Sequence, residues 1–220
     1  MEYILIVISV LLSLISLFLI FRDIQDNEDS YTNIPSKKNI YLYSSVAIII
    51  TTIISVFLTY YNQENSFVYK VKVVLILNIL WAVAFIDLKS YRIPNLFIIY
   101  GLIIRGIILI FELINYSPRT KFIVIGELVA SLVLLIATLL TRFTVKNSIG
   151  YGDIKLFIIM GLTLGMTGIW DAMFLSMIVI FLISLYVIIT KTKSRKDSLP
   201  FAPAIALGTY LSIILSLMWG

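Results

Sequence analysis

Eight apolar runs, each 16 to 20 residues long, dominate this 220-residue sequence and leave short polar stretches between them. A helix that crosses a hydrocarbon layer about 30 Å thick needs about 20 predominantly apolar residues. The sequence therefore predicts an all-α polytopic membrane protein with about eight transmembrane helices. The predicted spans are Tyr3 to Phe21, Ser44 to Tyr60, Phe67 to Ile86, Leu96 to Ile114, Phe122 to Leu140, Ile154 to Ile169, Ala172 to Thr190 and Phe201 to Trp219.

The composition narrows the chemistry that such a protein can perform. The chain contains no cysteine and no histidine, which excludes disulfides, iron–sulfur clusters, Cys/His zinc sites, thiol nucleophiles and a Ser-His-Asp triad. Any reaction must use carboxylates, Lys, Tyr, Ser or Thr, and we expect neither a cofactor nor a metal. With 60% hydrophobic residues, the net charge of +5 indicates loops that face anionic lipid rather than a nucleic-acid partner.

The distribution of basic residues predicts the orientation in the membrane, because Lys and Arg in short loops stay on the cytoplasmic side. With the N-terminus outside, twelve of the 17 basic residues fall in cytoplasmic loops, and the outer loops hold only Lys70, Lys72, Arg119 and Lys121. Arg105 lies inside a predicted helix. We therefore expect a multi-pass protein of the cytoplasmic membrane, with both termini outside and the loops after the first, third, fifth and seventh runs in the cytoplasm.

The chain shows no long linker and no internal repeat of 20 to 50 residues. We predict an N-terminal two-helix membrane appendage at residues 1–66 and a membrane core at residues 67–220. The polar stretch from Arg22 to Tyr41, which joins the first two runs, is interpreted as a solvated cytoplasmic loop.

Four acidic residues lie within or at the ends of predicted spans, where an unpaired charge costs several kcal/mol. Asp87 ends the third span and Asp153 begins the sixth, so the predicted topology places both at the cytoplasmic boundary. Two carboxylates in one wet pocket share a proton and can act as base and acid on a peptide bond. The alternative is structural: Asp153 caps a helix, and Asp87 pairs with Lys89 or Arg92.

The positions of the remaining two acids, Glu112 and Glu127, favour a structural role for them. Glu112 lies seven residues after Arg105, about two helical turns, so the two residues share a face and are expected to pair with Glu127 across the bundle. Glycines distinguish Asp153 from such pairs. Gly150 and Gly152 permit positive φ and close backbone approach just before Asp153, which a plain interfacial loop does not require.

These residues together resemble the GxGD aspartyl proteases of the type IV prepilin peptidase family, including their archaeal preflagellin peptidase relatives. The resemblance rests on four features between Phe67 and Gly220. They are Gly150-Tyr151-Gly152-Asp153 with Lys155, the stretch Asp87 to Arg92-Ile93-Pro94-Asn95, the spacing of 66 residues between the two aspartates, and the late segment Leu199-Pro200-Phe201-Ala202-Pro203.

The resemblance implies that Asp87 and Asp153 are the catalytic pair of a membrane-embedded aspartyl endopeptidase, supported by the motif residues Gly150, Gly152, Lys155, Arg92, Pro94 and Asn95. It implies cleavage at the cytoplasmic face of prepilin-like precursors, whether pilins, pseudopilins, competence proteins or flagellin-like proteins, which carry a basic leader and then a hydrophobic helix. Larger bacterial members also methylate the new N-terminus and carry a cysteine-bearing zinc insertion. This chain has no cysteine, which leaves its methyltransferase activity open.

The segment with Pro200, Phe201 and Pro203 predicts how a substrate is held. Two prolines withdraw amide donors and keep the preceding backbone extended. We hypothesise that the segment folds back beside the two aspartates and aligns the cleavage site by main-chain hydrogen bonds. Alternatively, the prolines only start the last helix.

Three other functions stay open on the sequence alone. A presenilin or signal-peptide-peptidase type of intramembrane protease shares GxGD, although its first aspartate usually follows a tyrosine, whereas Asp87 follows Ile86. An ion-coupled transporter would use intramembrane carboxylates as relays. A catalytically silent assembly protein is the third. The particular precursor and the oligomeric state do not follow from the sequence.

Overall fold

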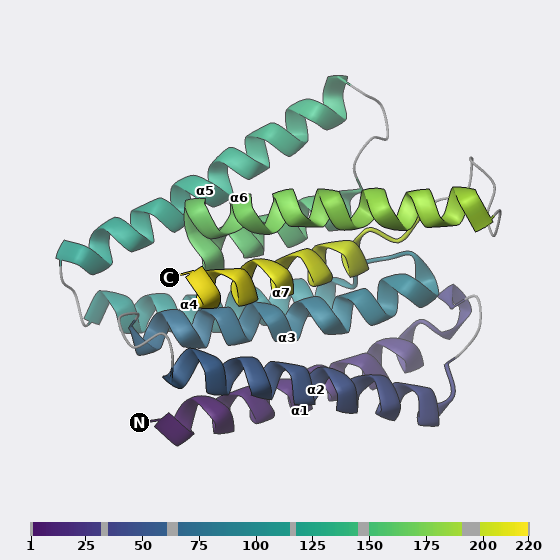
Figure 1. The fold of residues 1–220 in the computed structure, drawn as a ribbon, viewed down its shortest axis with the longest axis horizontal. Helices are drawn as coiled ribbons and strands as arrows, with labels where there is room; N and C mark the ends of the chain where they lie inside the picture. The colour runs from purple at the N-terminus through teal and green to yellow at the C-terminus, as the bar shows by residue number, and fades with distance from the viewer. Residues whose placement is uncertain are drawn as a thin grey trace.

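The computed structural model describes residues 2–31, 35–60, 66–114, 118–144, 150–190 and 199–219, and within these ranges the protein is all-helical (Figure 1). Six helices are long and apolar enough to cross a membrane, and the last is a shorter apolar helix. The elements are α1 (Glu2–Asp26), the short 3-10 helix η1 (Glu28–Ser30), α2 (Lys37–Tyr60), α3 (Phe67–Ser90), α4 (Asn95–Ile114), α5 (Pro118–Thr144), α6 (Tyr151–Thr190) and α7 (Ala202–Trp219).

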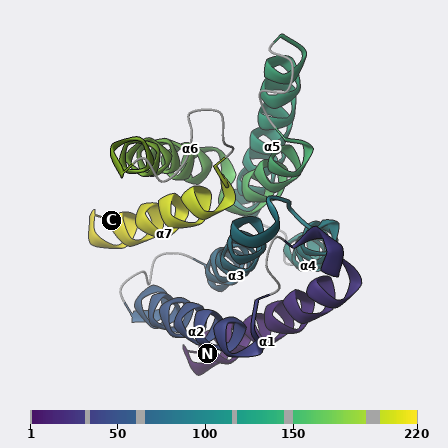
Figure 2. The ribbon, with the colours of Figure 1, turned by 90° about the vertical axis from the view of Figure 1, so that its right-hand side faces the viewer.

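Helix α3 forms the centre of the bundle, surrounded by α1, α2, α4, α6 and α7 (Figure 2). Every residue from Val73 to Asp87 is buried. A helix that is apolar all round is buried on every side. The other long helices each keep a broad apolar face exposed, which suits contact with lipid.

Helices α1 and α2 are joined to α3 by buried hydrogen bonds as well as by packing. The Ser13 hydroxyl donates to the Asn78 side-chain oxygen at 2.5 Å, and the Tyr43 hydroxyl donates to the Trp81 carbonyl at 3.1 Å. Serines 9, 13 and 16 of α1 are fully buried, and such small residues let helices approach closely in a membrane. The N-terminal helix pair therefore shares the core of the bundle, while the domain boundary at residue 66 stays a prediction.

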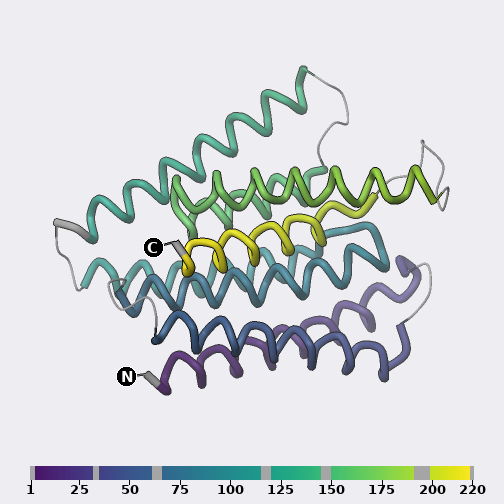
Figure 3. Tube along the Cα trace, in the orientation of Figure 1, coloured from purple at the N-terminus to yellow at the C-terminus, as the bar shows by residue number. Residues whose placement is uncertain are grey.

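Helix α6 reverses direction at Gly165, where two antiparallel helical halves that correspond to the spans predicted at 154–169 and 172–190 meet (Figure 3). Residues 155 to 162 run beside α4, where Arg105 Nε donates to the Leu162 carbonyl, and the later half runs antiparallel to α7, where Ser176 meets Ile205. Gly165 has φ +70°, a left-handed conformation that glycine adopts without a steric penalty. The described residues thus contain seven helices, the eight-helix count is not confirmed, and the break lies before the predicted position.

With this reversal in α6, the helix ends lie in two groups at opposite ends of the bundle (Figure 1). One end of the bundle holds the end of α1, the start of α2, the α3–α4 turn, the start and end of α6 and the start of α7. The opposite end holds the Gly165 turn and the C-terminus of α7. The prediction of a solvated loop from Arg22 to Tyr41 is wrong in part, since α1 continues to Asp26 and α2 begins at Lys37.

Candidate active site

Asp87 lies in the last turn of α3, and the residue is 7% exposed. The helix ends because Tyr91 adopts a left-handed conformation with φ 52°, and its N–H donates to the Asp87 carbonyl at 3.0 Å. Pro94 then supplies a carbonyl that accepts from Phe97 N–H in the first turn of α4. The tight turn between α3 and α4 therefore fixes Asp87 at a helix end.

The Asp87 carboxylate caps the start of α7, a helix that begins 115 residues later in the chain. The backbone N–H of Ala202 donates to Asp87 Oδ2 at 3.0 Å, and the backbone N–H of Phe201 donates to the same carboxylate. The first N–H groups of a helix have no partner within it and carry its positive dipole end, so they stabilise an anion. The structure thus places the predicted proline segment against Asp87.

Only part of that segment is extended. Pro203 already belongs to the first turn of α7, and the Phe201 carbonyl accepts from Ile205 N–H at 3.1 Å as an ordinary N-terminal residue. Residues 199–201 precede the helix, and Pro200 is among them. The structure therefore gives Pro203 the helix-start position, and substrate alignment by Pro200, Phe201 and Pro203 stays a prediction.

Asp153 is the third residue of α6 and is half-buried. Its carboxylate accepts from the backbone N–H of Gly150, whose own carbonyl accepts from Ile154 N–H at 3.2 Å. The Asp153 contact is the half of a capping box in which the third helical residue reaches back to the N-cap amide, since Gly150 has no side chain to supply the other half. The Asp153 carboxylate also lies close enough to Asp87 for their negative charges to interact. The structure therefore brings the two predicted aspartates together from two helix ends.

The two glycines before Asp153 provide space for close approach, and neither adopts the positive φ that glycine permits. Within the described ranges, the one glycine with positive φ is Gly165. A Cβ on Gly152 would lie 2.8 Å from Ile93 Cβ, and a Cβ on Gly150 would lie 3.0 Å from Asp153 Oδ2. Gly152 lets the start of α6 pack directly on the α3–α4 turn that follows Asp87, and Gly150 leaves space for the Asp153 carboxylate.

Two further motif residues join the same elements. Lys155 Nζ donates to Asn95 Oδ1 at 2.8 Å, which links the first turn of α6 to the first turn of α4. Pro94 is buried between the helices. The resemblance gave Lys155 only a supporting place in the motif. In the structure this side chain also fixes the distance between the two helix starts that flank the aspartates.

Arg92 has a partner that the sequence did not indicate. Its guanidinium contacts Asp23 Oδ2 at 2.6 Å, and the Tyr31 hydroxyl donates to the same oxygen at 2.7 Å. Burial and the neighbouring Asp23 charge raise the pKa of Tyr31 above its usual value. Asp23 is buried although it was assigned to the solvated loop, and Arg92 therefore pairs with it rather than with Asp87.

No sequence signal distinguished Asp23 from the other acids in its polar stretch, Asp26, Glu28 and Asp29. Its role depends on a contact across 69 positions of the chain. That contact anchors the end of α1 to the turn that bears Asp87.

A second charged cluster lies toward the opposite end of the bundle and is fully paired. Lys72 contacts Glu112 at 2.8 Å and also Glu127, while Arg105 contacts Glu112 at 3.0 Å and also Glu127. None of these side chains is more than 6% exposed. We call Lys72, Arg105, Glu112 and Glu127 the buried quartet. The predicted pairing of Arg105 with Glu127 is confirmed, and Glu112 pairs with the same guanidinium rather than with Glu127.

Lys72 is the member of the quartet that sequence reasoning misplaced. Lys70 and Lys72 were counted in an outer loop, but α3 begins at Phe67 and both side chains are buried. A Lys directed into the bundle needs an anionic partner because an unpaired buried charge is costly. The two glutamates at membrane depth were the sequence signal that could have indicated a buried lysine as their partner.

In the described part of the chain, no group of three or more acidic residues is arranged to hold a metal ion. The two aspartates lie at one end of the bundle, and each carboxylate accepts from backbone N–H groups. Such an arrangement can exchange protons with water and with a polarised carbonyl.

Comparison with known proteins bears on the same region. Residues 74–189 match the model of the type IV leader peptidase family, a range that includes both aspartates and the turns around them. The prepilin leader peptidase/N-methyltransferase of Bacillus subtilis strain 168 is 30% identical over 141 residues, which cover 64% of this chain and 54% of that protein. The chain thus spans about half the length of this curated relative. No solved structure matches the chain.

Proposed function

This chain belongs to the type IV leader peptidase family, and we propose that it is a membrane-embedded aspartyl endopeptidase that cleaves the leader of prepilin-like precursors. Asp87 and Asp153 are the catalytic pair. The observation that supports the proposal is that Asp153 lies close enough to Asp87 for their charges to interact, while backbone N–H groups donate to both carboxylates. Two carboxylates whose charges repel favour a state with one proton between them, which is the state that peptide hydrolysis by two aspartates requires.

In the proposed mechanism one carboxylate removes a proton from a water molecule, and the resulting hydroxide attacks the scissile carbonyl carbon. The protonated carboxyl group donates its proton to the carbonyl oxygen, which gives a neutral tetrahedral intermediate. Collapse of the intermediate breaks the C–N bond. The carboxyl group formed in the first step protonates the leaving amine, and the other aspartate, now ionised, takes the proton of one hydroxyl, whose oxygen becomes the carbonyl of the new acid. The N–H groups of Phe201 and Ala202 hold Asp87 in position throughout.

The proposed substrates carry a basic leader followed by a hydrophobic helix. The relative in Bacillus subtilis is named for prepilin processing, and the shared family supports the same substrate class here. That relative is also named as an N-methyltransferase, and methylation of the new N-terminus by this chain stays open.

We place the aspartates at the cytoplasmic face. Lys70 and Lys72 lie in α3, so they no longer count as loop residues, and the bias of Lys and Arg toward the aspartate end becomes stronger. Single cysteines in this cysteine-free chain test the orientation. We expect an impermeant thiol reagent applied to intact cells to label Met166→Cys and to spare Asp29→Cys, which lie exposed near opposite ends. The reverse pattern would place the site outside.

A cleavage assay with purified protein and a leader-bearing precursor tests the proposed chemistry. We expect Asp87→Asn and Asp153→Asn each to lower turnover by at least about 10³-fold, because each removes one of the two proton-transfer groups. The matched control is Asp171→Asn, which makes the same change at an exposed aspartate in the second half of α6. This control should retain wild-type turnover.

Two results would contradict the proposal. Near wild-type turnover in either Asp87→Asn or Asp153→Asn would exclude the catalytic pair. Cleavage at a site other than the junction between the leader and the hydrophobic helix, determined by sequencing the product's N-terminus, would exclude a leader peptidase.

A further inference from the structure

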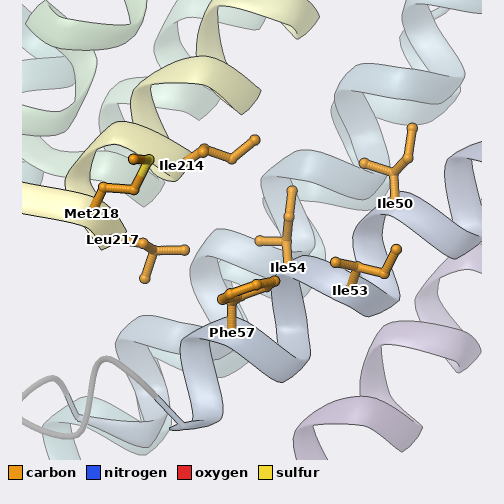
Figure 4. A pocket seen from close by; sticks show the side chains of 7 residues that line it. All are labelled: Ile50, Ile53, Ile54, Phe57, Ile214, Leu217 and Met218. Carbon is orange, nitrogen blue, oxygen red and sulfur yellow. The ribbon is translucent and has the colours of Figure 1, made fainter.

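An apolar groove runs along the outside of the bundle between α2 and α7, and α3 lines the part of it nearest the aspartates. It consists of two adjoining cavities with volumes of about 460 Å³ and 590 Å³, which share Ile50 and Ile214. Figure 4 shows the second cavity, where Ile54 and Phe57 of α2 lie across from Ile214 and Leu217 of α7. We call this the α2–α7 groove.

One end of the α2–α7 groove lies beside the candidate active site. The first cavity is lined there by Leu88 and Pro203. Leu88 follows Asp87 directly, and Pro203 follows Ala202, whose N–H donates to the Asp87 carboxylate. A molecule that fills the groove therefore has one end next to Asp87.

The dimensions of the α2–α7 groove suit a transmembrane helix. From Pro203 to Met218 the wall formed by α7 has a length of about 22 Å at 1.5 Å per residue, which is most of the hydrocarbon thickness of about 30 Å. Buried alanines, Ala47, Ala84 and Ala206, lie along the first cavity. Small residues at a membrane helix interface permit close approach of another helix.

The polar groups of the groove already have partners within the bundle. The Tyr43 hydroxyl donates to the Trp81 carbonyl at 3.1 Å, and the Tyr210 hydroxyl donates to the Leu77 carbonyl at 3.4 Å. Both hydroxyls are directed toward α3, which leaves the aromatic rings on the groove. An occupant therefore meets an apolar surface, as the side of a hydrophobic helix requires.

We propose that the α2–α7 groove binds the hydrophobic helix of the precursor and places the N-terminal end of that helix beside Asp87. This inference rests on the proposed function, which supplies a substrate with a leader directly before a hydrophobic helix. Binding the helix in the groove fixes the position of the leader junction relative to the two aspartates. The groove thereby selects substrates by the apolar segment that follows the cleaved bond.

Cross-linking tests the location of the helix. A precursor with one cysteine in the middle of its hydrophobic helix is combined in vesicles with Ile50→Cys or with Ile178→Cys. Both isoleucines are 41% exposed, but only Ile50 lines the groove, whereas Ile178 lies on α6. We expect cross-links at position 50 to exceed those at position 178 by about tenfold, in proportion to residence in the groove.

The same samples are assayed for cleavage, which separates the two proposals. Cleavage with equal cross-linking at both positions would overturn the groove and leave the proposed function standing. Equal cross-linking at positions 50 and 178 is also the result expected if lipid fills the groove. Preferential cross-linking at position 50 without cleavage would support the groove and overturn the proposed function.

Kinetics give a second test with a matched control. Leu207→Trp adds volume to the groove wall, and Leu182→Trp makes the same change on α6; the two leucines are 53% and 56% exposed. We expect Leu207→Trp to raise KM for the precursor about tenfold with kcat nearly unchanged, since it removes binding rather than chemistry. Leu182→Trp should leave KM at the wild-type value. Equal KM values for both variants would overturn the groove.

Discussion

The two ends of the bundle each contain buried charge, and they use it in opposite ways. The buried quartet combines two cations with two anions, and every member contacts both members of opposite charge. At the other end, Asp87 and Asp153 have the same charge, and backbone N–H groups are their hydrogen-bond partners. The quartet is electrostatically satisfied, whereas the aspartates can still accept and donate protons.

This difference teaches that membrane depth alone does not identify a functional carboxylate. Glu112 and Glu127 are at least as buried as Asp87, yet their charge is neutralised by Lys72 and Arg105. What distinguishes the aspartates is the absence of such neutralisation by Arg92, whose guanidinium contacts Asp23. We therefore expect substitutions in the quartet to change stability and substitutions around the aspartates to change turnover.

The largest expected effect is on stability, in the quartet. Lys72→Met leaves Glu112 and Glu127 without one of their two cations, and breaking a buried ion pair costs about 3–5 kcal/mol. The control Lys121→Met removes an exposed lysine of α5 and should change the free energy of unfolding by less than about 0.5 kcal/mol. Unfolding in detergent measures both. If the two variants are equally stable, the quartet is not a structural element.

The next effect is on turnover, at the contact between α6 and the α3–α4 turn. Gly152→Val introduces a side chain where Ile93 Cβ would lie 2.8 Å from the new Cβ. The aspartates must then separate, and a displacement of about 1 Å can lower turnover about 100-fold. Gly106→Val in α4 meets no atom within 4 Å and is the control. Full activity in Gly152→Val would show that the close packing does not position Asp153.

A smaller effect is expected where α7 meets Asp87. Replacing Pro200 and Pro203 with alanine loosens the backbone whose N–H groups bond to the carboxylate. We expect cleavage to fall about tenfold while the free energy of unfolding changes by less than about 1 kcal/mol. Cleavage and thermal unfolding are measured together. Parallel losses, or no loss of either, would leave the prolines only the role of starting α7.

The smallest effect concerns the anchor of the aspartate end. Tyr31→Phe removes one hydrogen bond to Asp23 and should destabilise the protein by about 1 kcal/mol near neutral pH. Burial and Asp23 raise the pKa of Tyr31, so the folded protein keeps this phenol protonated where the unfolded chain ionises. Wild-type stability should therefore fall as the pH rises above about 10, more steeply than that of Tyr31→Phe. The exposed Tyr41→Phe is the control, and equal slopes would contradict this assignment.

Much of the protein could be predicted from local sequence. Apolar runs of the length of a membrane span predicted the helices, and the observed ends differ mainly because amphipathic turns extend α1, α2 and α5 beyond the apolar core. The break in α6 lies earlier than predicted because Gly165 adopts a positive φ inside an apolar run. Hydropathy gives no information about backbone conformation. The two aspartates could be found because an ionisable residue at a helix end, near glycines, stands out in such a sequence.

The sequence by itself determined the all-helical membrane fold and the pair of aspartates, because both depend on composition and on spacing along one chain. Only the tertiary structure decided how the charges are used. Asp23 pairs with Arg92 and Lys72 pairs with Glu112 across 69 and 40 positions, respectively. The start of α7 donates its N–H groups to Asp87 across 115. These partners depend on how the helices pack against one another, so they cannot be deduced from the spacing of residues along the sequence.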